Sequence, residues 1–251
     1  MNPCFEVARA ARRKIYEAYI NAATIKHPRL AKLARLLEER GVAIQLVDKH
    51  RLFELARSKE HQGVVIKTST YPYESFDQLL GVRRLLLLDN VEDPTNVGGI
   101  IRSAEVFGFE AICLPLRGTP EIYPSVVKVS AGASEYARIC RDRSANQYLR
   151  AALDDGYRVV ALDAKGTVDL PRLRIEADEK IFLVIGGEDK SVGQFILNSA
   201  HDVVRIPMQG RVNSSNASVA AGIALFYLSD AMACSVSAAD GTQGRGSVNA
   251  D

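Results

Sequence analysis

The feature that most constrains the fold is a series of short, mainly apolar segments that alternate with helical patterns from about residue 85 onward. Apolar segments of strand length occur at 85–91, 110–115, 157–163, 181–187 and 202–208. Helical periodicity falls between and after them, at 96–107, 124–130, 145–155, 191–200 and 216–233. Strands that are apolar at every position are typical of a parallel sheet covered by helices on both faces. The sequence therefore predicts an α/β domain with a parallel sheet.

A smaller α/β module of about 70 residues precedes this pattern. Its expected elements are helices at 5–20, 28–40 and 51–59 and strands at 42–47 and 63–69. Turn residues at 69–78 mark the boundary between the two patterns. Residues 235–251 at the end of the sequence are mostly small or polar and rich in glycine. The predicted division is a small α/β domain at 1–70, a linker at 71–83, a larger α/β domain at 84–234 and a disordered tail at 235–251.

The composition restricts the class of protein and its compartment. The chain has 251 residues, of which 47% are hydrophobic and 25% charged, which is ordinary globular usage. No apolar run approaches the ~20 residues of a membrane span, and the first residues lack the apolar core of a secretory signal. The four cysteines form no CxxC pair or Cys/His cluster. We therefore expect a cytoplasmic, reduced chain with no membrane and no metal.

The charge is unevenly distributed. Residues 1–70 carry 14 Lys and Arg against 7 Asp and Glu, whereas the remainder carries 18 against 23. A basic module joined to a mildly acidic one indicates that the first part binds a polyanion, although a solvated basic helix surface would give the same count.

Three segments that follow predicted strands concentrate polar and glycine residues, at 89–103, 185–193 and 206–218. In open parallel sheets, ligands bind beyond the carboxyl ends of the strands. The sequence lacks the GxGxxG, GxxxxGK[ST] and GxSxG motifs, which argues against dinucleotide-binding dehydrogenases, P-loop NTPases and α/β hydrolases. With a single histidine, His201, in the larger domain, a histidine-based triad is also disfavoured.

Each polar segment allows a functional and a purely structural interpretation. Asn96 and Gly98-Gly99 fit either close approach of a ligand or helix packing with Asn96 as the N-cap. Gly186-Gly187 would place Glu188 at the sheet edge, where backbone groups could hold adenine or ribose, or would form a simple turn before a helix. In the third segment, capping alone explains one of the Ser and Asn residues well, but hardly the whole run.

Together, the motifs resemble the SpoU/TrmH family of RNA ribose 2′-O-methyltransferases, within the SPOUT class. They read DNVEDPTNVGGIIRSAEVFG (89–108), IFLVIGGEDKSVG (181–193) and IPMQGRVNSSNASVAAGIALF (206–226), and SAGA (130–133) is also similar to a family segment. Upstream, HQGVV (61–65) and the basic module resemble the substrate-binding domain of the ribosomal-RNA branch, which is similar in fold to certain ribosomal proteins.

The resemblance implies a deep trefoil knot in the carboxyl-terminal domain, an S-adenosylmethionine pocket inside the knot and a homodimer. It implies catalytic roles for Asn96, Arg102, Glu188, Ser214 and Asn216. It implies cofactor contacts for Leu162, Gly186, Gly187, Ile206, Met208, Gly210 and Ser215. The family usually has leucine and valine where this chain has Ser215 and Ala217, a departure that bears on packing against the adenine.

The implied reaction is methyl transfer from S-adenosylmethionine to a ribose 2′-hydroxyl, expected on a guanosine. The basic module favours 23S ribosomal RNA over transfer RNA as the partner. The alternatives are a transfer-RNA 2′-O-methyltransferase and a catalytically silent RNA-binding or assembly factor.

Overall fold

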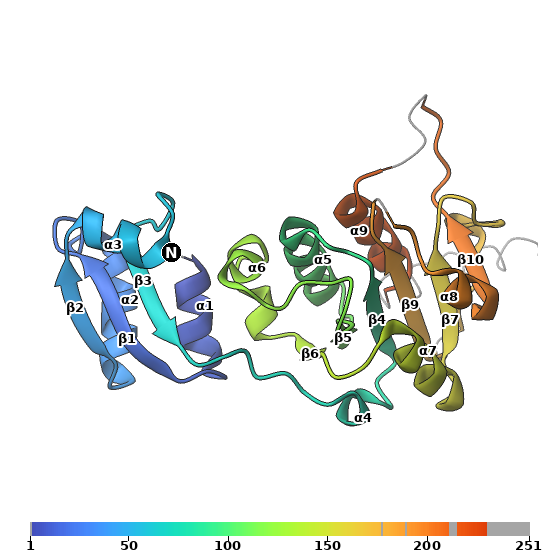
Figure 1. Ribbon diagram of the computed structural model, residues 1–251, viewed down its shortest axis with the longest axis horizontal. Helices are drawn as coiled ribbons and strands as arrows, with labels where there is room; N and C mark the ends of the chain where they lie inside the picture. The colour runs from blue at the N-terminus through green and yellow to red at the C-terminus, as the bar shows by residue number, and fades with distance from the viewer. Residues whose placement is uncertain (1, 177, 189, 211–214, 230–251) are drawn as a thin grey trace, which may run out of the picture. The chain divides into compact units, whose positions relative to one another are not determined.

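The structure is a computed structural model that describes residues 2–176, 178–188, 190–210 and 215–229 (Figure 1). It contains two compact units. The amino-terminal unit comprises Met1–Tyr73 and Ile122–Tyr136, and the carboxyl-terminal unit comprises Glu74–Glu121 and Ala137–Asp251. Within the described residues, no helix is both long enough and apolar enough to span a bilayer.

The amino-terminal unit is built on a three-stranded sheet in the order β2-β1-β3. The central strand β1 (Ile15–Asn21) runs parallel to β2 (Ala43–Val47) and antiparallel to β3 (Val64–Thr68). The core of the unit joins buried residues of β1 to α1 (Asn2–Ala10) and α2 (Pro28–Glu39). The helix α3 (Lys49–Ala56) contacts β1 and β3. The predicted helices at 28–40 and 51–59 and the strands at 42–47 and 63–69 are confirmed.

The predicted helix at 5–20 is wrong in its second half. The helix α1 ends at Ala10, and Ala11 takes a left-handed backbone conformation with φ +54°. The following residues IYEAYIN form β1, with Ala18 and Ile20 buried in the core. Their apolar spacing also fits a helix, but β-branched and aromatic residues favour strands, and pairing with strands on both sides decides the outcome.

A segment distant in sequence belongs to the amino-terminal unit. It contains α6 (Pro124–Val129) and the 3₁₀ helix η1 (Ala133–Glu135), and both contact α1. Buried Glu135 accepts a hydrogen bond from Arg13 Nε at 3.0 Å, and Tyr71 donates to the Ser134 carbonyl at 2.6 Å. The compact units thus differ from the predicted division, which places this segment in the larger α/β domain.

The carboxyl-terminal unit is a seven-stranded sheet, and every pairing between its strands is parallel. The order is β6-β5-β4-β9-β7-β10-β8. The strands are β4 (Arg84–Asp89), β5 (Ala111–Cys113), β6 (Arg138–Cys140), β7 (Arg158–Leu162), β8 (Val168–Asp169), β9 (Ile181–Gly186) and β10 (Asp202–Arg205). The predicted parallel sheet is confirmed; the short strands β6 and β8 were not predicted.

Helices cover this sheet, as its apolar strands require. All six residues of β4 are buried, although alternate side chains of a strand point to opposite faces. The helices α7 (Ala145–Asp154) and α8 (Gln194–Ser199) pack against each other and against β7. Elsewhere α5 (Pro94–Val106) packs along α9 (Ala217–Tyr227), which contacts β9 (Figure 1). The trefoil knot implied by the resemblance stays a prediction.

The segment expected to be a linker, 71–83, contributes to the core. Its short helix α4 (Phe76–Leu79) buries both Phe76 and Leu79. The ring of Phe76 lies 5.0 Å from that of Tyr148, centroid to centroid. This segment therefore anchors the start of the carboxyl-terminal unit.

The strand order creates a place for a ligand. The strands β5 and β6 are added on one side of β4. The later strands β7, β9 and β10 lie on the other side of β4. Such a reversal opens a crevice beyond the carboxyl ends of the strands. The three polar segments of the sequence follow β4, β9 and β10, and therefore gather at this edge.

Candidate functional site

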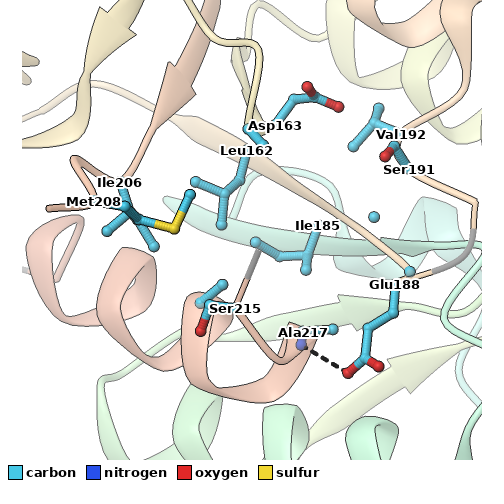
Figure 2. Close-up of a pocket in the computed structure, with 14 residues that line it drawn as sticks. Leu162, Asp163, Ile185, Glu188, Ser191, Val192, Ile206, Met208, Ser215 and Ala217 are labelled. Carbon is cyan, nitrogen blue, oxygen red and sulfur yellow. Dashed lines mark hydrogen bonds between the residues drawn. The ribbon is translucent and has the colours of Figure 1, made fainter. Parts of the chain in front are cut away.

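A pocket of about 130 Å³ lies beyond the carboxyl ends of β7, β9 and β10. Figure 2 shows Leu162 and Asp163 at the end of β7 and Ile185 on β9, together with side chains that follow β10. Its apolar walls come from Leu162, Ile185, Val192, Ile206, Met208, Ala217 and Ala220. Of the described residues that line it, Asp163 and Glu188 alone carry charges, and both are carboxylates. The pocket therefore suits a ligand that has an apolar part and a positive charge.

Two glycines shape the backbone at the end of β9. A Cβ atom on Gly187 would lie 2.0 Å from the Asn90 carbonyl oxygen, and one on Gly186 would lie 2.4 Å from the Val192 nitrogen. No side chain fits at either position, because both obstacles are backbone. The Gly187 N–H donates to the Asp89 carbonyl at 3.1 Å. The glycines thus let the segments after β4 and β9 pack tightly and deliver Glu188 to the sheet edge.

Asp89, the last residue of β4, also holds the far end of the segment after β9 in place. Its Oδ2 accepts a hydrogen bond from the Gly193 N–H at 2.8 Å, and the residue is 6% exposed. Burial raises the pKa of the Asp89 carboxyl, while the Gly193 bond acts in the opposite direction. Gly187 and Gly193 are therefore both bonded to the end of β4.

Glu188, Asn96 and Asn216 form one hydrogen-bonded cluster. Glu188 Oε1 accepts from Asn96 Nδ2 at 3.1 Å, from Asn216 Nδ2 at 2.6 Å and from the Ala217 N–H at 3.1 Å (Figure 2 draws the last). Asn216 Nδ2 also donates to Asn96 Oδ1 at 3.0 Å. Asn96 is 7% exposed, so this network satisfies a buried amide. Three of the five predicted catalytic residues therefore meet.

The N-caps of α5 and α9 bear on the interpretations that the sequence leaves open for Asn96 and for the polar segment at 206–218. The N-cap of α5 is Asp93, which accepts from the Thr95 N–H, so Asn96 is not the cap. Asn216 caps α9 by accepting from the Ser218 and Val219 N–H groups. A Cβ on Gly99 would lie 3.1 Å from Ser218 Cβ, so this glycine serves the close packing of α5 on α9.

The other predicted residues occupy different positions. Arg102 is exposed on α5, and among the described residues no hydrogen bond or ion pair to its guanidinium is recorded. Ser214 lies outside the described residues. Gly210 lines an adjoining hollow with Ile206 and Met208. The remaining predicted cofactor contacts line the pocket itself, namely Leu162, Gly186, Gly187, Ile206, Met208 and Ser215. The roles of all these residues stay predictions.

Sequence reasoning did not single out several residues that line the pocket. These are Asp163, Ala164, Ile185, Ser191, Val192 and Ala220. Asp163 had a usable signal, because it is a polar residue directly after an apolar strand. It is 9% exposed and accepts from the Lys165 N–H at 2.8 Å. In the part of the chain that the structure describes, no group of three His, Cys, Asp or Glu residues could hold a metal ion.

Comparison with known families gives two matches. Residues 83–226 match the SpoU rRNA Methylase family. Residues 1–74 match a domain described as RNA 2′-O ribose methyltransferase substrate binding.

Individual relatives agree with these matches. An uncharacterized tRNA/rRNA methyltransferase of Mycolicibacterium vanbaalenii is 33% identical, over 89% of this chain and 73% of its own length. A TrmH family tRNA/rRNA methyltransferase of Staphylococcus aureus is 32% identical, over 80% of this chain and 83% of its own. A solved AdoMet-bound rRNA methyltransferase from Sinorhizobium meliloti is 24% identical, with a TM-score of 0.76, over 90% of this chain and 84% of that one.

The Glu188 cluster gives a prediction for stability. Glu188→Ala removes the acceptor of three donors, and we expect it to lower the free energy of unfolding by about 1 to 2 kcal/mol. Glu188→Gln keeps an oxygen at the same place and should cost less than half as much. Urea denaturation of the full chain measures both. Equal losses for the two variants would contradict the acceptor role.

Proposed function

This chain belongs to the SpoU rRNA Methylase family, and we propose that it transfers the methyl group of S-adenosylmethionine to a ribose 2′-hydroxyl in 23S ribosomal RNA. That it is an RNA methyltransferase acting on tRNA or rRNA follows from the membership. The observation that carries the finer proposal is the pocket at the sheet edge, bordered by the hydrogen-bonded cluster of Asn96, Glu188 and Asn216.

The lining of the pocket fits this cofactor. S-adenosylmethionine supplies a methyl group activated on a positively charged sulfur. Leu162, Ile206 and Met208 offer an apolar surface for an adenine ring, and the carboxylates of Asp163 and Glu188 offset the positive charge. Ser215 and Ala217 stand where the family usually has larger apolar residues, which leaves less apolar surface at this wall.

The residues around Glu188 would orient the ribose. All three bonds that Glu188 accepts within the described residues go to Oε1, which leaves Oε2 as an acceptor for a hydroxyl. Bound S-adenosylmethionine would supply the methyl group: the carbon–oxygen bond would form as the carbon–sulfur bond breaks, the neutral thioether would leave, and the hydroxyl proton would pass to water. The delocalised guanidinium of arginine is a poor proton acceptor, so Arg102 would stabilise the developing alkoxide or anchor a phosphate rather than act as the base.

The choice of substrate rests on the amino-terminal unit. Residues 1–74 match a domain whose description is substrate binding in RNA 2′-O ribose methyltransferases. The surplus of Lys and Arg in residues 1–70 suits a polyanion such as RNA. Only RNA offers the 2′-hydroxyl. The guanosine target and the cytoplasmic location rest on the resemblance and stay predictions.

A homodimer is part of the proposal, with the exposed face of α5 and α9 as its interface. Val106 is 65% exposed, Val219 55% and Phe226 42%. The Phe226 ring lies 5.6 Å from that of Phe107, centroid to centroid, so both helices contribute to one apolar surface. Arg102 is four residues before Val106 on α5 and shares its side of the helix. A second copy on this face would therefore surround Arg102.

Transfer of labelled methyl from S-adenosylmethionine to RNA that lacks ribose methylation tests the reaction. We expect label in 23S ribosomal RNA, at a nuclease-resistant dinucleotide, because 2′-O-methylation blocks cleavage at that ribose. Label in transfer RNA would keep the chemistry and overturn the substrate. The absence of both label and cofactor binding would instead favour a catalytically silent RNA-binding protein.

Replacement of Arg102 tests its role in the reaction. Arg102→Ala should slow methyl transfer by about 10²- to 10³-fold, because it removes charge stabilisation present in the transition state. Affinity for S-adenosylmethionine, measured by calorimetry, should change less than about twofold, because Arg102 is not among the pocket-lining residues. Arg150→Ala, at an arginine on α7 outside the site, is the control. Loss of cofactor binding in Arg102→Ala would refute the role.

The dimer proposal predicts a change in oligomeric state. Val106→Glu combined with Phe226→Glu places charges in an apolar interface and should shift sedimentation from dimer to monomer, with loss of methyl transfer. Leu116→Glu, at a residue 52% exposed in the loop after β5, should leave the dimer intact. A wild-type chain that sediments as a monomer would contradict the proposal.

A further inference from the structure

Asp163 carries a negative charge that the described fold does not match. It directly follows β7 and lines the pocket at the sheet edge, yet it is not among the cofactor contacts that the family resemblance implies. It is 9% exposed, and no described Lys, Arg or His forms an ion pair with it. A buried carboxylate without a cation is unfavourable, because the protein interior solvates charge poorly. The charge therefore calls for an explanation in the ligand.

One oxygen of this carboxylate has a structural role. Asp163 Oδ1 accepts a hydrogen bond from the Lys165 N–H at 2.8 Å, and the Asp163 carbonyl accepts from the Gly166 N–H at 3.0 Å, which together close a turn. The turn packs against β10, since a Cβ on Gly166 would lie 2.5 Å from the Val204 carbonyl carbon. The amide oxygen of an asparagine would serve this turn equally well. The turn thus explains an oxygen at this position but not a charge.

The second oxygen, Oδ2, is a free acceptor. It has no hydrogen-bond partner in the part of the chain that the structure describes. Within that part, the buried side-chain atoms that are both sealed from solvent and unpartnered are His61 Nε2 and Arg141 Nε. Asp163 Oδ2 is not one of them, so it stays accessible from the pocket that Asp163 lines. A donor on a ligand can therefore reach it.

The chemistry of the cofactor limits which group can occupy this acceptor. The sulfonium of S-adenosylmethionine has no hydrogen to donate, whereas the α-ammonium, the ribose hydroxyls and the adenine amino group have. Of these donors the ammonium alone is charged, and hydrogen bonds of charged groups are roughly twice as strong as neutral ones. In Figure 2, Asp163 and Ser191 lie toward one end of the pocket, and Ile206 and Met208, which offer apolar surface for adenine, lie toward the other. Charge and position both favour the ammonium.

From these observations we propose that Asp163 accepts a hydrogen bond from the α-ammonium group of the cofactor and thereby selects adenosine compounds that carry this group. The proposal rests on the proposed function, because it takes S-adenosylmethionine as the ligand. Methyl transfer leaves the ammonium unchanged, so Asp163 holds substrate and product alike. It therefore acts on affinity and not on the rate of the chemical step.

Calorimetric titration of the full chain with three ligands tests this contact. Asp163→Asn keeps an oxygen for the Lys165 N–H and replaces Oδ2 by an amide nitrogen, which cannot accept. Its affinity for S-adenosylmethionine and for the demethylated product, S-adenosylhomocysteine, should fall by about 10- to 100-fold. Its affinity for 5′-methylthioadenosine, which keeps the nucleoside but lacks the ammonium, should change less than about twofold. Retained binding of this third ligand also shows that the pocket is folded.

Two further variants guard the comparison. Asp154→Asn removes the same charge from an exposed position of α7 and should leave all three affinities within about twofold of the wild type. Asp163→Ser, whose hydroxyl can also accept from the Lys165 N–H, should repeat the pattern of Asp163→Asn and replaces it if the asparagine variant does not fold.

Two patterns of loss would overturn the contact. An equal loss for all three ligands, in a variant that unfolds at the same urea concentration as the wild type, would assign Oδ2 to the nucleoside. A loss confined to S-adenosylmethionine would assign the carboxylate to the sulfonium charge.

The outcomes separate this proposal from the proposed function. Wild-type binding of both cofactor forms, with unchanged affinities in Asp163→Asn, would overturn the ammonium contact and leave the cofactor pocket standing. Absence of binding of either form to the wild-type chain would overturn both. With RNA as the methyl acceptor, Asp163→Asn should raise KM for S-adenosylmethionine while kcat changes less than about threefold. A fall in kcat without a change in cofactor affinity would contradict the assignment.

Discussion

The pocket depends on one carboxylate oxygen. Glu188 Oε1 joins the end of β9 to the side chain of Asn96 on α5 and to the start of α9, through three donors that come from two other segments. An acceptor that carries charge makes stronger hydrogen bonds than a neutral one, and a shared acceptor couples the positions of its donors. Movement of any one segment would therefore disturb the other two, which keeps the wall of the pocket and the side chains of Asn96, Glu188 and Asn216 in register.

That oxygen is in place because of backbone contacts that side chains would prevent. Gly187 approaches the Asn90 carbonyl so closely that even a methyl group is excluded. Asn90 itself has a positive φ of +58°, and Asp89 holds the opposite end of the loop through the Gly193 N–H. The motifs of the sequence thus encode two different things, the chemical groups and the close packing that positions them.

Much of this could be predicted from the sequence, for identifiable reasons. Apolar runs such as LLLL (85–88) are typical of a parallel sheet covered on both faces, and polar residues that follow such strands gather at one edge of the sheet. The second half of the helix predicted at 5–20 failed, because periodicity alone does not distinguish Ile15–Asn21 as a helix from a strand whose pairing partners lie 26 to 53 residues away. The association of Ile122–Tyr136 with the amino-terminal unit could not be predicted either, because it depends on contacts between residues far apart in the sequence, such as Arg13 and Glu135.

The electrostatics of the two units argue for separate tasks. The described charged groups of the pocket are carboxylates, which suit a cationic cofactor but repel the phosphates of RNA. Affinity for RNA must therefore come from elsewhere, and residues 1–70 carry the surplus of Lys and Arg. With binding energy supplied by residues 1–70, the pocket can be adapted to the sulfonium and, in the proposed reaction, to the ribose alone. A loss of basic residues in the amino-terminal unit would then raise the RNA concentration needed for half-maximal rate, while the rate at saturation would depend on the groups around Glu188.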